Sequence, residues 1–565
     1  MGQQVRLDDN LYTVVGVMPR SFENVLAPSA QLWAPLQYDP SLPADGREWG
    51  HHLRMVGRLR EGVSREQAGS ELDVILHTLA QTNAKGYDSS GGAPDGMMVN
   101  ELQSDLTQGV RPALPAVLGA VFLVLLIACV NVTNLLLARG AQRQAEFAMR
   151  AALGAAQRRL VRQLLTESLL LALLGAVFGM VVALAGVRAL VALSPLDLPR
   201  VSAIGVDGAV FLFALGMTTL IGVVVGLVPA LQASRKDLHT GVQRSSRRTT
   251  GGGHWTRRIL VVAEVSLAAV LLVSTGLLLR SMQHLFAVDP GFDASHLLTM
   301  QVQESGHRFD SDAARVRFFT QALEQVRQVP GVISAGFTAQ LPLSGDNDVY
   351  GVEFEGKNNP VGDPAFRYAV TPGYTETMHI PLRRGRLLNE HDEAGSPVAV
   401  LINESFANLK FSEQDPIGRR VRVGLDVGHA DRPWATIVGV LGDVKQQSLA
   451  MGDENAFYIS TAQWEWADNA QSLVVRTRGD AAALVPVLRD AIWSVDKDQP
   501  IVRVATMDNL LAASEAERHF VLMLFEAFAL VGLVLAAMLA WLLCRSVCRE
   551  LHASSPRAAL HRSIR

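Results

Sequence analysis

Long apolar runs separated by polar stretches are the main pattern along this chain. An apolar helix of about 20 residues is long enough to cross the hydrocarbon core of a bilayer. Lipid offers no hydrogen-bond partners, so each run is predicted to be helical. The alternative, buried helices of a large soluble protein, fits poorly with so many runs in one chain. Five runs qualify: Leu114–Ala138, Leu169–Leu193, Ala209–Ala233, Ile259–Leu279 and Phe520–Leu543.

The charges between the runs predict which loops face the cytoplasm. Arginine and lysine gather at 139–165 and 234–258, whereas the loop 194–208 holds one arginine and two aspartates. Short cytoplasmic loops are enriched in basic residues, so both basic loops are predicted inside and residues 283–515 outside. Residues 1–112 must then also lie outside. This requires either a span upstream of this chain or a different position for the first segment, and we favour the upstream span.

The basic segment 139–165, RGAQRQAEFAMRAALGAAQRRLVRQLL, is patterned like an amphipathic helix. Glu146 precedes Arg150 by four residues, the favourable order for an ion pair on one helix face. Gly154 is a predicted break between two helical pieces. The segment could lie on acidic lipid head groups, but we favour docking of a cytoplasmic partner. Its apolar stripe recurs at helical spacing: Ala145, Met149, Leu153, Ala156, Leu160 and Leu164.

Two sequence patterns occur twice and predict a duplicated half. VRL…YTVVGV, within residues 5–17, is similar to VRV…ATIVGV, within 421–440. MVGRLREGVSREQAGSELDVIL is similarly echoed by LVVRTRGDAAALVPVLRDAIWSVD, and each is predicted to be a strand followed by an amphipathic helix. Each copy precedes an apolar run, which resembles the repeated halves of transporters rather than a short-period repeat. Residues 283–515 mix strand and helix patterns and predict an α+β domain of two lobes.

Composition and motifs narrow the function. The net charge of −3 argues against a nucleic-acid partner, and the mean hydropathy is positive. The sequence contains no G-x-x-x-x-G-K-[ST], H-E-x-x-H or G-x-S-x-G, so we predict no catalytic residues and no metal site. The adjacent His51 and His52 and the acidic stretch 389–393 are interpreted as surface groups. The three cysteines form no ligand set.

Several residues inside the apolar runs are candidate functional or packing positions. Glu264 and Glu526 are acids within predicted spans, which makes each a functional candidate, although both lie near an interface where water could reach them. Two pairs of glycines at helical spacing allow close approach of helices in lipid, the alternative being incidental glycine. These packing candidates are Gly175, Gly179, Gly222 and Gly226.

The residues resemble those of a known family. LLIACVNVTNLLLARGAQRQAEFAMRAALGAAQRRLVRQLLTESLLLALLGAVFG is similar to the core of ABC-transporter permeases of the MacB/FtsX type. YTVVGVMPRSF, GRLREGVSREQA, VPGVISAGFTAQLPLSG and VAVLINESFANLKF…DPIGRRV resemble the extracytoplasmic domains of that family. The two-copy layout resembles the duplicated, ADOP-type branch. The resemblance spans residues 1–543 and implies a polytopic α-helical membrane protein of about five transmembrane helices, with α+β MacB-like periplasmic core domains, in the bacterial inner membrane.

The resemblance also implies a function and partners. It predicts the permease subunit of an ABC transporter that couples a separate cytoplasmic ABC ATPase to export or efflux by mechanotransmission; the alternative is an FtsX-like regulatory scaffold acting on an extracytoplasmic partner. Further expected partners are membrane lipid and, as open alternatives, a second permease copy or an adaptor protein. No cofactor is expected. Family substrates include macrolides, lipoproteins, peptides and toxins. The family's coupling pattern falls on Arg143, Glu146, Arg150, Leu153, Gly154 and Ala155, with Arg139 at its start.

The resemblance implies a division of the chain. The family's first span, the start of its first outer domain and a second coupling helix after Leu543 are not matched, so we expect a chain that is incomplete at both ends. The expected parts are the C-terminal part of a first MacB-like domain at 1–112, an FtsX-like three-helix permease domain at 113–233, a basic cytoplasmic linker at 234–258, a transmembrane helix at 259–280, a second MacB-like domain at 283–515, a transmembrane helix at 520–543 and a divergent tail at 544–565.

Overall fold

The structure is a computed structural model whose chain forms two compact units. The strand unit comprises residues 1–22, 30–107 and 284–516, and the helix unit comprises 23–29, 108–283 and 517–565. The residues described are 2–7, 9–19, 22, 24, 30–35, 55–82, 99–107, 111, 113–142, 157–193, 207–235, 254–356, 362–412, 414–425, 433–464, 468 and 470–553.

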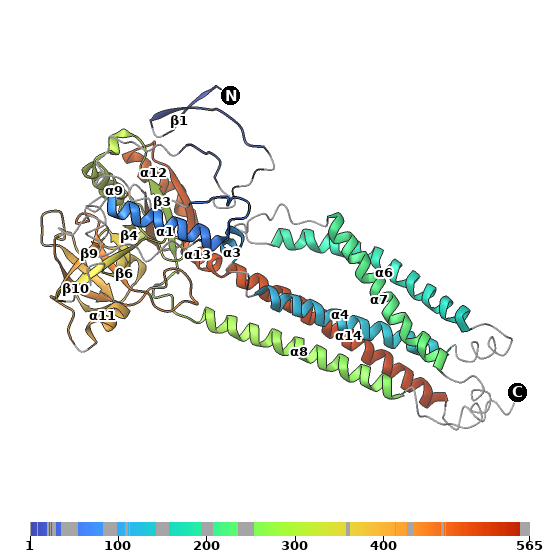
Figure 1. The fold of residues 1–565 in the computed structure, drawn as a ribbon. Helices are drawn as coiled ribbons and strands as arrows, with labels where there is room; N and C mark the ends of the chain where they lie inside the picture. The colour runs from blue at the N-terminus through green and yellow to red at the C-terminus, as the bar shows by residue number, and fades with distance from the viewer. Residues whose placement is uncertain are drawn as a thin grey trace. The chain divides into compact units, whose positions relative to one another are not determined.

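Long helices occupy all five predicted apolar runs (Figure 1). They are α4 (Ala113–Gln142), α6 (Gln157–Leu193), α7 (Gly208–Arg235), α8 (His254–Phe286) and α14 (Ala516–Ala553). Four contain stretches long and apolar enough to cross a membrane: Leu114–Leu135, Leu169–Ala189, Arg258–Leu285 and Arg518–Met538. In α7 the corresponding described stretch, Gly208–Val223, is shorter. The prediction of helical spans is therefore confirmed for four runs, and the fifth run is helical over its whole length.

Helices α4, α8 and α14 pack together along one apolar seam. We call this the three-helix seam; its buried residues are Ala120, Ile127, Ala268, Leu271 and Phe525. Gly532 of α14 faces it, and a Cβ at that position would lie 3.2 Å from Leu271 Cδ1 and 3.6 Å from Ile127 Cδ1. Small residues allow close approach in lipid, where helices associate by packing and hydrogen bonding rather than by the hydrophobic effect.

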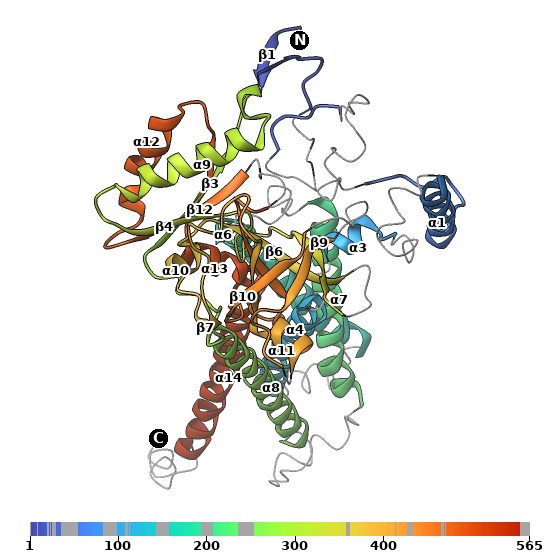
Figure 2. The same cartoon turned by 90° about the vertical axis from the view of Figure 1, so that its left-hand side faces the viewer.

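The strand unit is built on an 11-stranded sheet within the described residues, and Figure 2 shows it from a second side. Its strands are β3 (Leu297–Gln303), β4 (Val332–Thr338), β5 (Val349–Phe354), β6 (Asp363–Val370), β7 (Leu382–Gly385), β8 (Ala399–Asn403), β9 (Arg420–Leu425), β10 (Ala435–Leu441), β11 (Ala456–Ser460), β12 (Ala470–Thr477) and β13 (Ile501–Thr506). Its helices are α9 (Asp312–Arg327), α10 (Tyr374–Met378), α11 (Glu404–Phe411), α12 (Val485–Val495) and α13 (Met507–Ser514), with 3-10 turns at His307–Phe309 and Ala482–Leu484. This confirms the predicted α+β content.

The sheet divides into two groups of strands. The first group, in the order β4-β12-β3-β13, is covered by α9 and α12, whose Phe319 and Ile492 are fully or almost fully buried. The second group runs β11-β8-β10-β9-β5-β6, and β11 also pairs with β6, so its pairings form a closed ring. Strand β7 pairs with β10 outside this path. Between the groups, β4 and β6 are joined at one position, Thr338 opposite Val370.

The N-terminal region contains β1 (Gln4–Leu7), β2 (Asn10–Thr13), α1 (Arg65–Thr82) and α3 (Leu102–Leu106). β1 and β2 pair antiparallel, as the sequence predicts, and so do their proposed counterparts β9 and β10. The surroundings differ: Val5 is 40% exposed, whereas Val421 at the matching position of β9 is fully buried. The duplication itself stays a prediction.

The prediction of a strand before α1 was wrong. Residues 55–60 are described but form no strand. Their proposed counterpart, β12, is hydrogen-bonded between β3 and β4. A strand needs such neighbours for its backbone groups, and no described strand pairs with residues 55–60. The pattern alone therefore does not make a strand there.

Glu304, directly after β3, is a buried acid whose titration affects folding. Its side chain is 2% exposed, and Oε2 lies 3.6 Å from Arg315 Nε. Burial raises the pKa of Glu304 to about 8, although the charge of Arg315 lowers it; Asp312 and Asp468 raise it further. The pKa of a glutamate in the unfolded chain is about 4.3. The folded state therefore holds this proton more tightly, so stability falls as pH rises from about 4.3 to about 8.

We predict that Glu304→Gln stabilises the strand unit, with a gain that grows between pH 5 and pH 8. The gain is expected to reach about 3 kcal/mol at pH 8, because the neutral amide removes the cost of a buried charge. Urea unfolding of the full-length protein in detergent, followed by tryptophan fluorescence, measures it. The exposed Glu393→Gln is the control and is expected to show no such pH dependence. An equal gain at both pH values would contradict the prediction.

Candidate functional site

The predicted coupling segment lies between two membrane helices. Arg139 belongs to the last turns of α4, which ends at Gln142, and α6 begins at Gln157. The other predicted coupling residues lie outside the described residues and stay predictions: Arg143, Glu146, Arg150, Leu153, Gly154 and Ala155. Leu160 and Leu164, the last two members of the predicted stripe, lie in α6. The end of the basic segment is therefore continuous with a membrane helix.

The glycine pairs predicted for helix packing have different surroundings. A Cβ at Gly222 of α7 would lie 3.0 Å from the Cβ of Ala172 in α6, so the two helices approach closely there. Gly175 and Gly179 are exposed on α6, with no atom of the described structure within 4 Å of such a Cβ. The surroundings of Gly226 lie outside the described residues. Close packing is thus observed at Gly222 alone of the three glycines that can be compared.

We predict that Gly222→Leu weakens the contact between α6 and α7. The isobutyl group has no room beside Ala172, so the helices must separate. Thermal unfolding in detergent should show a lower midpoint than for Gly216→Leu. Gly216 lies on the same helix, and no described atom lies within 4 Å of a Cβ there, which makes it a matched control. Equal midpoints for the two variants would contradict the close packing of α6 and α7 at Gly222.

A second candidate site is a buried arginine network at the start of the strand unit, directly after α8. Arg476 of β12 is 5% exposed. Its Nη1 donates to Asp293 Oδ2 at 3.1 Å and to the Ser295 carbonyl at 2.8 Å. Its Nη2 donates to the Asp293 carbonyl, and its Nε to the Thr377 carbonyl, each at 2.8 Å. One side chain thus joins the segment that follows α8 to β12 and α10.

The carboxylate of Asp293 is held ionised in this network. Burial alone would raise the pKa of Asp293, but hydrogen bonds from Ser295, together with the Arg476 charge and His379, lower it to about 2. His379 Nδ1 lies 3.2 Å from Asp293 Oδ2. The charge pair between Asp293 and Arg476 is therefore intact at neutral pH.

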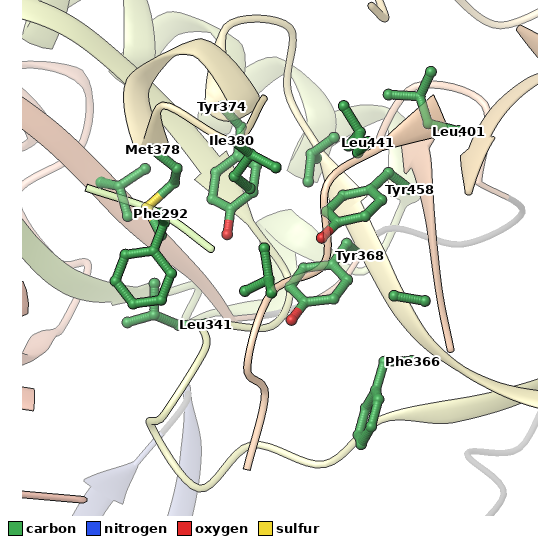
Figure 3. Packing of buried hydrophobic residues seen from close by; sticks show 14 of the residues in the cluster. Phe292, Leu341, Phe366, Tyr368, Tyr374, Met378, Ile380, Leu401, Leu441 and Tyr458 are labelled. Atoms are coloured by element: carbon green, nitrogen blue, oxygen red, sulfur yellow. The ribbon is translucent and has the colours of Figure 1, made fainter. Parts of the chain in front are cut away.

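Two of the chain connections between the helix unit and the strand unit, the one after α8 and the one before α14, share one apolar core, drawn in Figure 3. After α8, Phe292 is 6% exposed, and Leu285 packs against the same cluster. Before α14, Met507 of α13 is fully buried in that cluster, and Leu510 packs against it. Tyr374 and Met378 of α10 and Leu441 of β10 complete this core (Figure 3). Both connections are therefore anchored in the same packed core.

Sequence reasoning missed this anchoring site. The sequence pattern around Arg476 predicts only a strand followed by a helix, and nothing in the sequence singles out Asp293 or Met507. The one signal in the sequence for this network is Arg476 itself, because it directly follows SLVV, a run with the pattern of a buried strand. An arginine among buried strand residues requires a paired partner, but its partner's position far along the sequence cannot be read from the pattern.

We predict that Arg476→Met destabilises the strand unit by about 3 kcal/mol, because Asp293 and buried carbonyl groups lose their donor. The exposed Arg478→Met, two residues away, is the matched control and should change stability by less than about 0.5 kcal/mol. The shift in urea midpoint of the full-length protein measures both. Similar midpoints would show that the network does not hold the unit together.

The remaining candidates from the sequence are placed as follows. Glu264 is fully buried in the helix unit, whereas Glu526 is exposed on α14. In the acidic stretch 389–393, Asp392 accepts from Arg386 Nη1 at 2.7 Å, which makes it part of an ion-paired turn. His51 and His52 lie outside the described residues. Within the described residues, no group of three or more His, Cys, Asp or Glu side chains could hold a metal ion.

Comparison with known proteins identifies the family. A family model described as the MacB-like periplasmic core domain matches residues 259–490. A second, described as the FtsX-like permease C-terminal, matches residues 118–238. The chain belongs to the ABC-transporter permeases of the MacB/FtsX type. It is a multi-pass protein of the bacterial inner membrane with a MacB-like extracytoplasmic domain, and permeases of this type work with ABC ATPase partners.

Solved structures with similar domains include two from related transporters. The periplasmic region of MacB from Actinobacillus actinomycetemcomitans is 15% identical, and the match covers 40% of this chain and 95% of that chain with a TM-score of 0.27. The extracellular domain of the noncanonic ABC-type transporter YknZ from Gram-positive bacteria is 14% identical. The match covers 36% of this chain and 93% of that chain, with a TM-score of 0.25. No curated protein matches the chain.

Proposed function

We propose that this permease transmits the motion of a separate cytoplasmic ATPase to its extracytoplasmic domain, and that this motion drives export. The observation that carries the proposal is that the chain connections after α8 and before α14 are anchored in one core. Leu285, at the end of α8, packs against the cluster that buries Met507, which leads towards α14. Because protein cores are close-packed and transmit strain, a displacement of either helix is passed to the domain.

The basic segment 139–165 is the proposed contact for the ATPase. Its first residues are the end of α4, and its last part belongs to α6. Arg139, Arg143, Glu146 and Arg150 supply the charged contacts in this proposal, and Leu153, Gly154 and Ala155 supply the turn. An arginine-rich surface forms bidentate hydrogen bonds with carboxylates, which makes an acidic groove of the ATPase the matching surface.

The proposed division of the chain follows from the same function. Residues 113–233 form the three-helix permease domain, 234–258 the cytoplasmic linker, and 283–515 the second extracytoplasmic domain of a duplicated permease. Residues 1–112 would then be part of the first such domain. Adaptor proteins, lipid or a second permease copy are further proposed partners. The large extracytoplasmic domain favours export over a purely regulatory scaffold.

We predict that the double change Arg143→Glu and Arg150→Glu strongly reduces capture of the ATPase. The permease is solubilised from its native membrane and used as bait, and the bound ABC ATPase is identified and quantified. Reversing two charges at a salt-bridged contact should reduce capture about tenfold or more, because each buried charge pair is worth about 1.5 kcal/mol or more.

The matched control reverses two charges in the other basic loop, Arg247→Glu with Arg248→Glu, and should leave capture unchanged. Loss of capture in both double variants would indicate a general charge effect. Absence of any ABC ATPase with the unmodified bait would overturn the proposed function. Export measured with the neighbouring gene products then distinguishes transport from regulation of an extracytoplasmic partner.

A further inference from the structure

The three-helix seam contains a polar pair between α4 and α8. Asn131 Nδ2 of α4 donates to Glu264 Oε1 of α8 at 2.7 Å, and also lies 3.3 Å from the carbonyl of Leu535 in α14. Glu264 is 0% exposed. Its Oε2 is buried without a hydrogen-bond partner among the residues that the structure describes. One side chain of α4 therefore contacts both other helices of the seam at the same level.

Neighbouring contacts show how the helices run. Asn131 of α4 is hydrogen-bonded to Glu264 of α8. One turn earlier on α4, Ile127 lies beside Gly532 of α14. Leu271, which lies two turns after Glu264 on α8, is next to the same glycine. The two helices therefore run antiparallel. Asn134 of α4 is 3% exposed and lies two turns beyond Ile127 on the same face. Both atoms of its side-chain amide are buried without a hydrogen-bond partner in the described part of the chain, so this end of the seam is polar.

The buried Glu264 bears on the register of the helices, because an apolar pair would cost less to bury at this position. Apart from Asn134, the other buried seam residues are apolar or small, namely Ala120, Ile127, Ala268, Leu271 and Phe525. Apolar side chains can repack when one helix slides past another by one turn, whereas a single hydrogen-bonded polar pair is satisfied in one register only. Lipid offers no alternative partner, so a shifted register would leave both groups unsatisfied.

The two helices joined by this pair serve different ends of the proposed mechanism. Arg139, at the start of the proposed ATPase contact, lies eight residues after Asn131 on α4. Beyond Glu264, α8 continues to Phe286, and Leu285 packs into the core of the strand unit. The Asn131–Glu264 bond is thus a direct non-covalent link between the helix that leads to the cytoplasmic segment and the helix that leads to the extracytoplasmic domain.

We propose that Asn131 and Glu264 are positioning residues that fix the register of α4 against α8, so that the two helices move as one when the ATPase acts. The first part depends only on the helix unit, and the second part rests on the proposed function. Glu264 acts here as a hydrogen-bond acceptor, and Asn131 as the donor that holds it.

The register is tested with spin labels at two exposed positions beside the pair. Val132 of α4 is 45% exposed and Val265 of α8 is 58% exposed, so labels on cysteines at these positions leave the seam intact. The three native cysteines are replaced by alanine, and the full-length protein is placed in lipid nanodiscs. The distance distribution between the labels is measured by electron paramagnetic resonance.

Glu264→Gln keeps the acceptor oxygen and should retain one narrow distance. Glu264→Leu and Asn131→Leu each remove the bond, and the population outside the main distance should rise about threefold, the size expected for one hydrogen bond in a membrane bundle. The double variant Asn131→Leu with Glu264→Leu should have the same population outside the main distance as either single variant, because both changes remove the same bond. Glu526→Leu, which alters an exposed acid on α14, is the matched control and should behave as the unmodified protein.

The second part is tested by adding the captured ATPase with ATP. The distance should stay constant in the unmodified protein and change in Glu264→Leu, where the helices are no longer joined. An unchanged distribution in Glu264→Leu, or equal effects of Glu264→Gln and Glu264→Leu, would overturn the register assignment. A bait that captures no ATPase would overturn the proposed function alone, because the nanodisc measurement without ATPase still decides the register.

Discussion

The absence of hydrogen-bond partners in lipid is the constraint on which the rest of this structure depends. It forces the apolar runs into continuous helices and makes an unpaired polar side chain costly inside the membrane. In the described helix unit Asn131 donates to Glu264 Oε1, whereas Glu264 Oε2 has no partner among the described residues. Outside the membrane the same rule operates in the arginine network, where Arg476 satisfies carbonyl groups from two separate segments.

Much of the fold could be predicted because its signals are local. The helices α4, α6, α7, α8 and α14 follow from run length and hydropathy, and α9, α11 and the β1–β2 hairpin follow from periodicity. The strand expected at residues 55–60 was wrong because strand formation depends on neighbours far along the chain. The order of the sheet, with β12 between β3 and β4, could not be read from periodicity for the same reason.

The candidate site was predictable only where chemistry is concentrated in one segment. Arginine clustering and a family resemblance pointed to 139–165, and an intramembrane acid pointed to Glu264. The partner of Glu264 was not predicted, since Asn131 lies in another helix and gives no signal on its own. The anchoring core was missed as well, because Met507 and Phe292 are ordinary apolar residues whose importance comes from the segments they join.

The ring of strands β11-β8-β10-β9-β5-β6 has a mechanical consequence. Closed circuits of hydrogen-bonded strands have no free edges, so neighbouring strands cannot slip without breaking many bonds at once. Between this ring and the other group of strands, the sheet ladder has one residue pair, Thr338 with Val370, and the two groups also share the apolar core that contains Leu297 and Val474. The ring should therefore keep its shape under load, and any bending of the sheet is expected at the narrow β4–β6 connection, where few backbone hydrogen bonds have to change.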